Sequence, residues 1–279
     1  MFKRQLILAV VVAMAVNVGC DDGDEPADDQ PAEVQQHADE EQPVDDETGG
    51  DPAAVDPAAM PTLQTYGELR NINMRNDYSP SVGLAEGLNG QEPINHAVGA
   101  LGDLTGEITV IDDTVYLGHA DDEPHFEQVP VAKLDDDLDA TILFGAATDG
   151  WADVDLGDAR DLESLQKRLE QWRDEHNIDA PLSFRITDPR PYVEWHVVDG
   201  ERLPEEGANS CDERKEYAHQ YETDGQPVTI AGLFTTDHTA VVVDHTTSIH
   251  AHVVDDEGRS GHVDAVELSD DAGLTVAIR

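Results

Sequence analysis

The stretch SIHAHVVDDEGRSGHV, residues 248–263, carries three of the chain's 12 histidines and predicts two antiparallel strands joined by a short turn. A first strand would end near Asp255 and a second would begin near Arg259, with Asp256-Glu257-Gly258 as the loop between them. Three-residue hairpin loops commonly end on a residue in the left-handed conformation, which glycine adopts without strain. We therefore expect a tight hairpin with Gly258 at its turn.

In that register the three histidines converge on one face of the hairpin. His252 lies directly opposite His262, and His250 shares their face because side chains alternate along a strand. Cβ atoms of directly opposite residues lie about 4.5–5.5 Å apart. This spacing suits a divalent ion that keeps an open coordination position. A loop of two or four residues would place His262 on the other face, and histidines also occur on half-exposed strands without a metal, so spacing alone leaves both interpretations open.

Outside this stretch, the pattern predicts strands with one clear helix. Leucines and Trp172 recur every three or four residues over 161–178, which is typical of an amphipathic helix. Two β-rich runs broken by Asp112-Asp113 indicate a hairpin over 105–118. Further strands are expected at 140–147, at 182–200 around a proline-containing corner, and at 228–234, 240–254, 261–268 and 274–278. His245 is an odd number of residues from His250 and should point away from the other histidines. The predicted class is α+β, mostly β, with mixed or antiparallel sheets.

The charge balance excludes one class of function. The chain has 61 Asp and Glu against 16 Lys and Arg, a formal net charge of −45 over 279 residues. So few cations cannot neutralise phosphates, so nucleic-acid binding is not expected. Dispersed acids of one sign repel one another unless salt screens them, which favours a halophilic protein.

The N-terminal residues predict export. Residues 1–19 have two early cations and then an apolar run too short to span a membrane, which is the order of a secretory signal peptide. The following Cys20 sits where a bacterial lipoprotein is lipidated, although Asn17 replaces the usual leucine. Residues 20–62 are acidic and proline-containing and predict a disordered tether. We expect a lipid-anchored protein of the cell envelope with a folded domain at 63–279.

The hairpin and a second segment together resemble the α-acetolactate decarboxylase family. The sequence IHAHVVDDEGRSGHV is similar to the family's H-x-H and later G-H-V, which supply three histidine ligands to zinc. The sequence HAVGALGDLTGEITVIDDTVYLG, residues 96–118, is similar to the family block that holds an active-site glutamate. The resemblance implies the family's two-sheet architecture, Zn²⁺ or another divalent metal on His250, His252 and His262, and a catalytic role for Glu107.

The sequence departs from the family pattern at three places. Ala100 stands where the family block has threonine. Alignment places His196 where the family has an active-site arginine, so His196, when charged, or alternatively Arg185 or Arg190, is expected to bind the substrate carboxylate. The family's second glutamate comes from a C-terminal tail and has no counterpart before Arg279.

Two functions remain open from the sequence. The first is a zinc-dependent carboxy-lyase that converts acetolactate, or a related 2-hydroxy-3-oxo acid, to acetoin or its counterpart. In this reaction a metal would hold the charge of the enediolate and Glu107 would deliver the proton. The second is a non-catalytic envelope lipoprotein that uses the same metal-bearing scaffold to bind hydroxy acids, keto acids or metal. A homodimer is compatible with either function. Ca²⁺ binding by 133–140 is less favoured, because that segment lacks the spaced acidic loop pattern.

Overall fold

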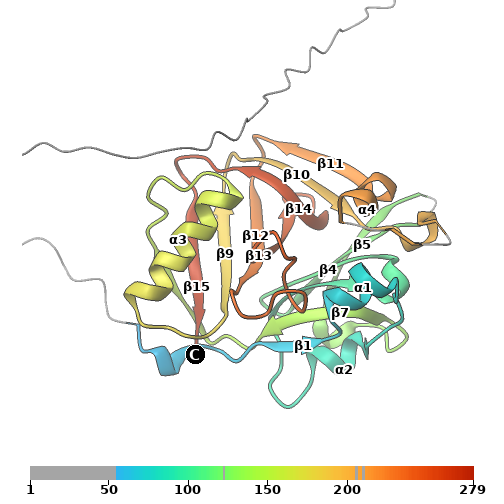
Figure 1. Ribbon diagram of the computed structural model, residues 1–279, viewed down its shortest axis with the longest axis horizontal. Helices are drawn as coiled ribbons and strands as arrows, with labels where there is room; N and C mark the ends of the chain where they lie inside the picture. Colours follow the sequence, from blue (N-terminus) through green and yellow to red (C-terminus); the bar gives the residue numbers. More distant parts are fainter. Residues whose placement is uncertain (1–54, 122, 205–206, 209–210) are drawn as a thin grey trace, which may run out of the picture. The chain divides into compact units, whose positions relative to one another are not determined.

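Two antiparallel sheets form the framework of the computed structural model, which describes residues 55–121, 123–204, 207–208 and 211–279 (Figure 1). Sheet A has seven strands in the order β1-β7-β3-β4-β5-β6, and β2 pairs with β7. Its strands are β1 (Gln64–Tyr66), β2 (Val82–Gly83), β3 (His96–Leu101), β4 (Gly106–Ile111), β5 (Thr114–His119), β6 (His125–Pro130) and β7 (Asp139–Ala146). The predicted hairpin is β4–β5, and Asp112 and Asp113 both adopt positive φ at its turn.

Sheet B has eight strands in the order β11-β10-β14-β13-β12-β9-β15-β8. Its strands are β8 (Gly150–Val154), β9 (Leu182–Asp188), β10 (Tyr192–Val197), β11 (His219–Asp224), β12 (Val228–Phe234), β13 (Ile249–Asp255), β14 (Ser260–Glu267) and β15 (Gly273–Ile278). Both sheets pair their strands in antiparallel fashion. This arrangement confirms the expected α+β, mostly β, two-sheet class.

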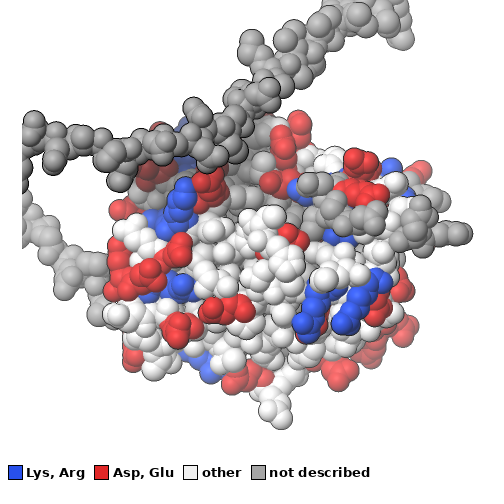
Figure 2. Space-filling view, in the orientation of Figure 1, with Lys and Arg blue, Asp and Glu red and all other residues white. Residues whose placement is uncertain are grey.

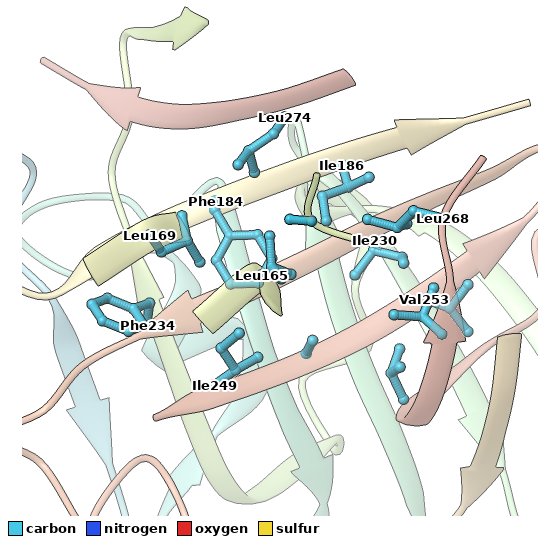
Figure 3. Close-up of a cluster of buried hydrophobic side chains, with 14 of the residues drawn as sticks. Leu165, Leu169, Phe184, Ile186, Ile230, Phe234, Ile249, Val253, Leu268 and Leu274 are labelled. Carbon is cyan, nitrogen blue, oxygen red and sulfur yellow. The ribbon is translucent and has the colours of Figure 1, made fainter. Parts of the chain in front are cut away.

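The predicted helix is α3 (Leu162–Glu175), and it covers one face of sheet B (Figure 1). Asp161 caps its N-terminus by accepting a hydrogen bond from the Ser164 backbone, and the Ser164 side chain accepts from the Asp161 backbone in return. Leu165 and Leu169 are fully buried against strands of sheet B, and Figure 3 shows them over Phe184 and Ile249. The leucine spacing in the sequence therefore reflects a real packing face.

The opposite face of sheet B packs on sheet A. Ala231 and Leu233 of β12 belong to one buried cluster with Val98 of β3 and Phe144 of β7. Strand β13 is consequently buried along its whole length. Ile249 and Val253 pack in the cluster beneath α3, so the alternating residues His250 and His252 face sheet A.

One predicted strand is wrong in its first half. The run at 240–248 forms turns with a single bridge between Thr239 and Val243, and β13 begins only at Ile249. Val242 and Val243 are nevertheless buried, because they pack between the sheets with Ala231 and Leu233. Their apolar character therefore reflects tertiary packing rather than strand pairing, and His245 lies on an exposed turn.

The remaining helical segments are short. They are α1 (Leu69–Arg75), α2 (Leu84–Leu88) and α4 (Cys211–Tyr217), with 3-10 turns at Pro57–Ala59, Gly102–Leu104, Val131–Lys133 and Gly200–Arg202. Among the described residues no helix is both long and apolar enough to cross a membrane. The predicted signal peptide, Cys20 and most of the predicted tether lie outside the described residues.

Acidic side chains are spread over much of the visible face, with few basic groups between them (Figure 2). This distribution agrees with the dispersed acids of the sequence, and an exposed carboxylate of this kind is repelled by its neighbours at low ionic strength.

Candidate metal centre

The β13–β14 hairpin has the predicted register. His252 pairs with His262 and Val254 pairs with Ser260, and Gly258 has a φ of 79°. Asp255 closes the loop, because its side chain accepts hydrogen bonds from the backbone N–H groups of Glu257 and Arg259 at 3.0 and 2.9 Å. The loop length that decides on which face His262 lies is thus fixed by local hydrogen bonds.

His250, His252 and His262, the histidine triad, converge on one point between the sheets. One ligand nitrogen from each lies within 4.8 Å of the others. Their ring centroids are 5.0–5.5 Å apart. In the described part of the chain, no other group of three His, Cys, Asp or Glu side chains meets the same spacing.

Hydrogen bonds orient two of the rings. His250 Nδ1 lies 2.8 Å from the Val242 carbonyl oxygen, so Nδ1 carries the proton and Nε2 offers a lone pair. His252 Nδ1 lies 3.0 Å from the Thr109 hydroxyl, which lies 2.6 Å from the Ser260 hydroxyl. If His252 donates to Thr109 and Thr109 donates to Ser260, each hydroxyl is used and His252 Nε2 is also free to bind a cation.

The His252 Nε2 atom is the most direct test of whether a metal fits. It is fully buried and has no hydrogen-bond partner within the protein. A buried polar atom without a partner is unfavourable by about 1–3 kcal/mol. A divalent ion shared with the other two imidazoles would satisfy it, so the residues present suit a metal.

The triad is poised in the neutral form that metal binding requires. Burial lowers the pKa of His250 to about 4. Burial, followed by repulsion from the neighbouring rings, lowers the pKa values of His252 and His262 well below their usual range. At neutral pH the three rings can therefore act as ligands without first releasing a proton.

Glu107 on β4 faces the triad from sheet A. Its Oε2 lies 3.6 Å from His252 Nε2, while Oε1 accepts a hydrogen bond of 3.2 Å from the Val198 backbone N–H. The side chain is almost fully buried, and this burial raises the pKa of Glu107 well above its ordinary value. The sequence-predicted glutamate thus lies beside the predicted histidines, although about 140 residues separate them along the chain.

His196 is also brought to the triad. It pairs with His262 across β10 and β14, so His196, His262 and His252 form one row across sheet B. Its Nδ1 lies 2.8 Å from Asp264 Oδ2, and Lys215 Nζ lies 2.6 Å from Asp264 Oδ1. Burial alone would raise the pKa of Asp264, but these two partners and His262 outweigh it and lower the pKa to about 2. The ionised Asp264 therefore fixes the orientation of the His196 ring.

Arg185 is not brought to the triad. It lies in the same cross-strand row, but β12 and its Ala231 separate it from His252. Two strand spacings correspond to about 10 Å. Its guanidinium donates a 2.8 Å hydrogen bond to Asp112 and stacks over Trp151 at 4.4 Å. Arg190 is farther along the chain and pairs with Asp271.

A cavity of about 320 Å³ opens beside the triad, and we call it the triad cavity. Apolar walls come from Ala100, Leu104, Ile142 and Val198, and the polar groups include Glu107, His196, His250, His262 and Asp264. Two cations that the sequence interpretation missed also line it, Arg214 and Lys215 of α4. The sequence offers one indication of them: α4, with the sequence CDERKEY, contains two adjacent basic residues in a chain that has few basic residues.

Comparison with known proteins agrees with the resemblance of the sequence motifs. The sequence profile of the family described as alpha-acetolactate decarboxylase matches residues 92–278. No curated protein matches the chain significantly.

Solved structures show a similar fold. An alpha-acetolactate decarboxylase from Bacillus subtilis strain 168 is 15% identical with a TM-score of 0.58, and the match covers 78% of this chain and 86% of that one. An acetolactate decarboxylase from Bacillus subtilis subspecies spizizenii is 16% identical with the same score and coverage. A Staphylococcus aureus protein of unknown function, described as similar to alpha-acetolactate decarboxylase, gives 15% identity, a TM-score of 0.58 and the same coverage. At these identities the likeness shows the fold.

Proposed function

The chain belongs to the α-acetolactate decarboxylase family, and on that premise we propose that it is a zinc-dependent carboxy-lyase acting on acetolactate or a related 2-hydroxy-3-oxo acid. The observation that carries the proposal is the meeting of the histidine triad with Glu107. A buried His252 Nε2 without a partner lies 3.6 Å from a buried carboxyl group. In this proposal one cluster would combine a cation site with a proton donor, the two groups that this reaction needs.

His250, His252 and His262 would hold the ion. Three neutral imidazoles leave its full positive charge in place and leave at least one coordination position open. When bound, zinc would act as a Lewis acid toward the hydroxyl and ketone oxygens, where negative charge develops as CO₂ leaves. Among hard and soft ligand sets, an all-imidazole site suits Zn²⁺ without excluding other transition metals.

Glu107 would deliver the proton that replaces the carboxylate. Its Oε1 accepts from the Val198 backbone N–H, so the proton belongs on Oε2, the oxygen that faces His252. Burial raises the pKa of this carboxyl well above its ordinary value, which favours the protonated form that can donate. Protonation of the carbon from this fixed position would give a single product stereoisomer, because the donor lies on one side of the triad cavity.

The apolar walls assist the same step. Ala100, Ile142 and Val198 line the triad cavity near Glu107 and restrict the access of water. Where water is excluded, the carbanion-like carbon takes its proton from the positioned acid rather than from solvent. The low local polarity also strengthens the electrostatic interactions inside the cavity.

Export belongs to the proposal as well. The signal-like residues 1–19 and Cys20 support a lipid-anchored enzyme of the cell envelope, and the dispersed acidic surface supports work at high salt. The anchor is tested by following the protein in membrane and soluble fractions, with Cys20→Ser as the variant expected to lose it.

The enzymatic proposal is tested with the protein purified in high salt, stripped with a chelator and reloaded with zinc. Acetoin and CO₂ release from acetolactate should appear only after reloading. Glu107→Gln should retain the metal and lose about 100- to 10,000-fold in rate, the usual contribution of a positioned acid. Glu127→Gln, an exposed glutamate of sheet A, is the control and should match the wild type. A zinc-loaded wild type that forms no acetoin would refute the enzyme and leave a metal-bearing binding protein.

A further inference from the structure

The carboxyl group of Glu107 is held in place by a chain segment that has an anchor of its own. Glu107 Oε1 accepts a hydrogen bond from the backbone N–H of Val198, the first residue after β10. One residue later the chain enters the 3-10 turn Gly200–Arg202. The contacts that fix residues 198–202, the 198–202 segment, therefore also fix the N–H group that orients Glu107.

Asp199 anchors the 198–202 segment with both oxygens of its carboxylate. Oδ1 accepts hydrogen bonds from the backbone N–H groups of Glu201 and Arg202 at 3.1 and 3.3 Å, which caps the 3-10 turn. Oδ2 lies 3.0 Å from Nε2 of His219, the first residue of β11, while the half-exposed Arg202 guanidinium is farther away at 3.9 Å. A carboxylate only accepts hydrogen bonds, so Nε2 of His219 carries the proton. Because Asp199 is only 4% exposed, its charge depends on these donors.

The same segment also packs against the backbone that leads into β4. A Cβ atom added to Gly200 would clash with the Asp103 carbonyl oxygen, so the two backbones are in direct contact. Asp103 belongs to the 3-10 turn Gly102–Leu104, which lies just before β4 and its Glu107. The segment thus meets the region of Glu107 at two points, through the Val198 N–H and through Gly200.

We infer that His219 is a positioning residue for the proton transfer, an inference that rests on the proposed function. Its hydrogen bond to Asp199 ties β11 to the segment that carries the Val198 N–H. That N–H holds Oε1 of Glu107, so that Oε2 faces His252. His219 itself does not line the triad cavity. Its loss should therefore disturb the delivery of the proton and leave substrate binding unaffected.

Two amide variants of His219 differ by one methylene group and form a matched pair. In His219→Gln the amide nitrogen can take the place of Nε2 and donate to Asp199, whereas the side chain in His219→Asn is too short to reach it. Zinc-loaded His219→Asn should lose about 10- to 100-fold in kcat with an unchanged KM, the effect of misplacing a reacting group by about 1 Å. His219→Gln should keep most of the wild-type kcat. Steady-state kinetics with acetolactate, at matched zinc content, give the comparison.

The configuration of the product gives a second measurement, which a merely structural role of His219 would not change. When Glu107 is no longer held, solvent competes with it for protonation of the carbon. His219→Asn should therefore form a mixture of acetoin enantiomers, whereas His219→Gln should form one, as measured by chiral gas chromatography. His176→Ala is the control, because it removes a half-buried imidazole that is hydrogen-bonded to the Trp172 carbonyl at the end of α3. It should match the wild type in rate and product.

Gly200→Ala disturbs the 198–202 segment from its other side and guards against a folding defect at β11. Its added Cβ must displace the segment from the Asp103 carbonyl, so it should show the same loss of kcat and of stereochemical purity. An unchanged kcat in folded, zinc-loaded His219→Asn or Gly200→Ala would overturn the inference. A His219→Gln variant as slow as His219→Asn would do so as well. These outcomes leave the proposed function intact, whereas a wild type that forms no acetoin would overturn the proposed function and this inference with it.

Discussion

His96 on β3 and His250 on β13 are both almost completely buried, and burial lowers the pKa of each to about 4. Each donates one ring N–H to a backbone carbonyl, His96 to Phe184 at 3.0 Å and His250 to Val242 at 2.8 Å. Burial, pKa and hydrogen bonding therefore do not distinguish the two residues.

Their surroundings do. The second nitrogen of His96 has no hydrogen-bond partner, its ring meets the edge of Trp151, and among the described residues His96 belongs to no cluster of three possible ligand groups. The nitrogen of His252 that lacks a partner meets two other imidazoles and Glu107. An isolated buried imidazole is a packing residue, whereas convergence of several on one point indicates a cation site. Three experiments can break or sharpen this distinction.

The largest effect is expected from removing a triad ring. His252→Ala should lower zinc affinity by more than about 100-fold, the upper effect of losing only a supporting residue. His96→Ala also removes a buried imidazole, but one outside the triad, and should keep the full metal content. Elemental analysis after dialysis gives the comparison. Equal retention of zinc by the two variants would show that the triad is not the site.

A smaller effect is expected from the residue behind His252. Thr109→Val removes the hydroxyl that orients the His252 ring and should weaken zinc by about 10- to 100-fold. Thr141→Val deletes a similarly buried hydroxyl, which donates to the Tyr78 and Leu101 carbonyls rather than contacting a triad ring. That variant should lose about 1 kcal/mol of stability and keep its zinc affinity. Competition with a chromophoric chelator measures the zinc affinity of both variants, and equal affinities would contradict the role of Thr109.

The smallest effect concerns His96 and pH. The pKa of His96 is lowered to about 4 in the folded state. Between pH 6.5 and about 4 its imidazole is therefore protonated in the unfolded chain and neutral in the folded one. Stability is therefore fully present above pH 6.5 and falls as the pH is lowered through this window. Lowering the pH to 5.5 should reduce the free energy of unfolding of His96→Gln by about 1 kcal/mol less than that of the wild type, as measured by urea unfolding of the metal-free protein. Parallel pH profiles for the wild type and the variant would contradict it.

The sequence was most informative where local rules decide the structure. Gly258 and the alternation of His250 and His252 determine the hairpin register, because loop length and side-chain period act over a few residues. The leucine spacing of α3 is likewise a local signal, because the helical period acts over a few residues. Glu107 came from a family resemblance, since no local rule relates a residue on β4 to one on β13.

Local rules failed where distant packing decides. Val242 and Val243 resemble strand residues, but they are buried between the sheets in a turn. Arg185 was considered as an alternative carboxylate ligand because it lies in the segment that aligns with the family's active-site arginine. The sheet order instead inserts β12 between β9 and β13, and it is α4 that brings Arg214 to the cavity. A short stretch of sequence predicts neither the order of the strands in the sheet nor the position of α4.

The compactness of the β13–β14 hairpin has a consequence for folding. All three triad residues lie within 250–262, so their ligand nitrogens can meet as soon as one hairpin forms, on a timescale of about 1–10 μs. Glu107 must arrive later, because the loop that joins it to His252 is about 140 residues long and its closure awaits the docking of sheet A. Binding of an ion by the three imidazoles would therefore need only the hairpin, whereas the site that includes Glu107 needs both sheets in place.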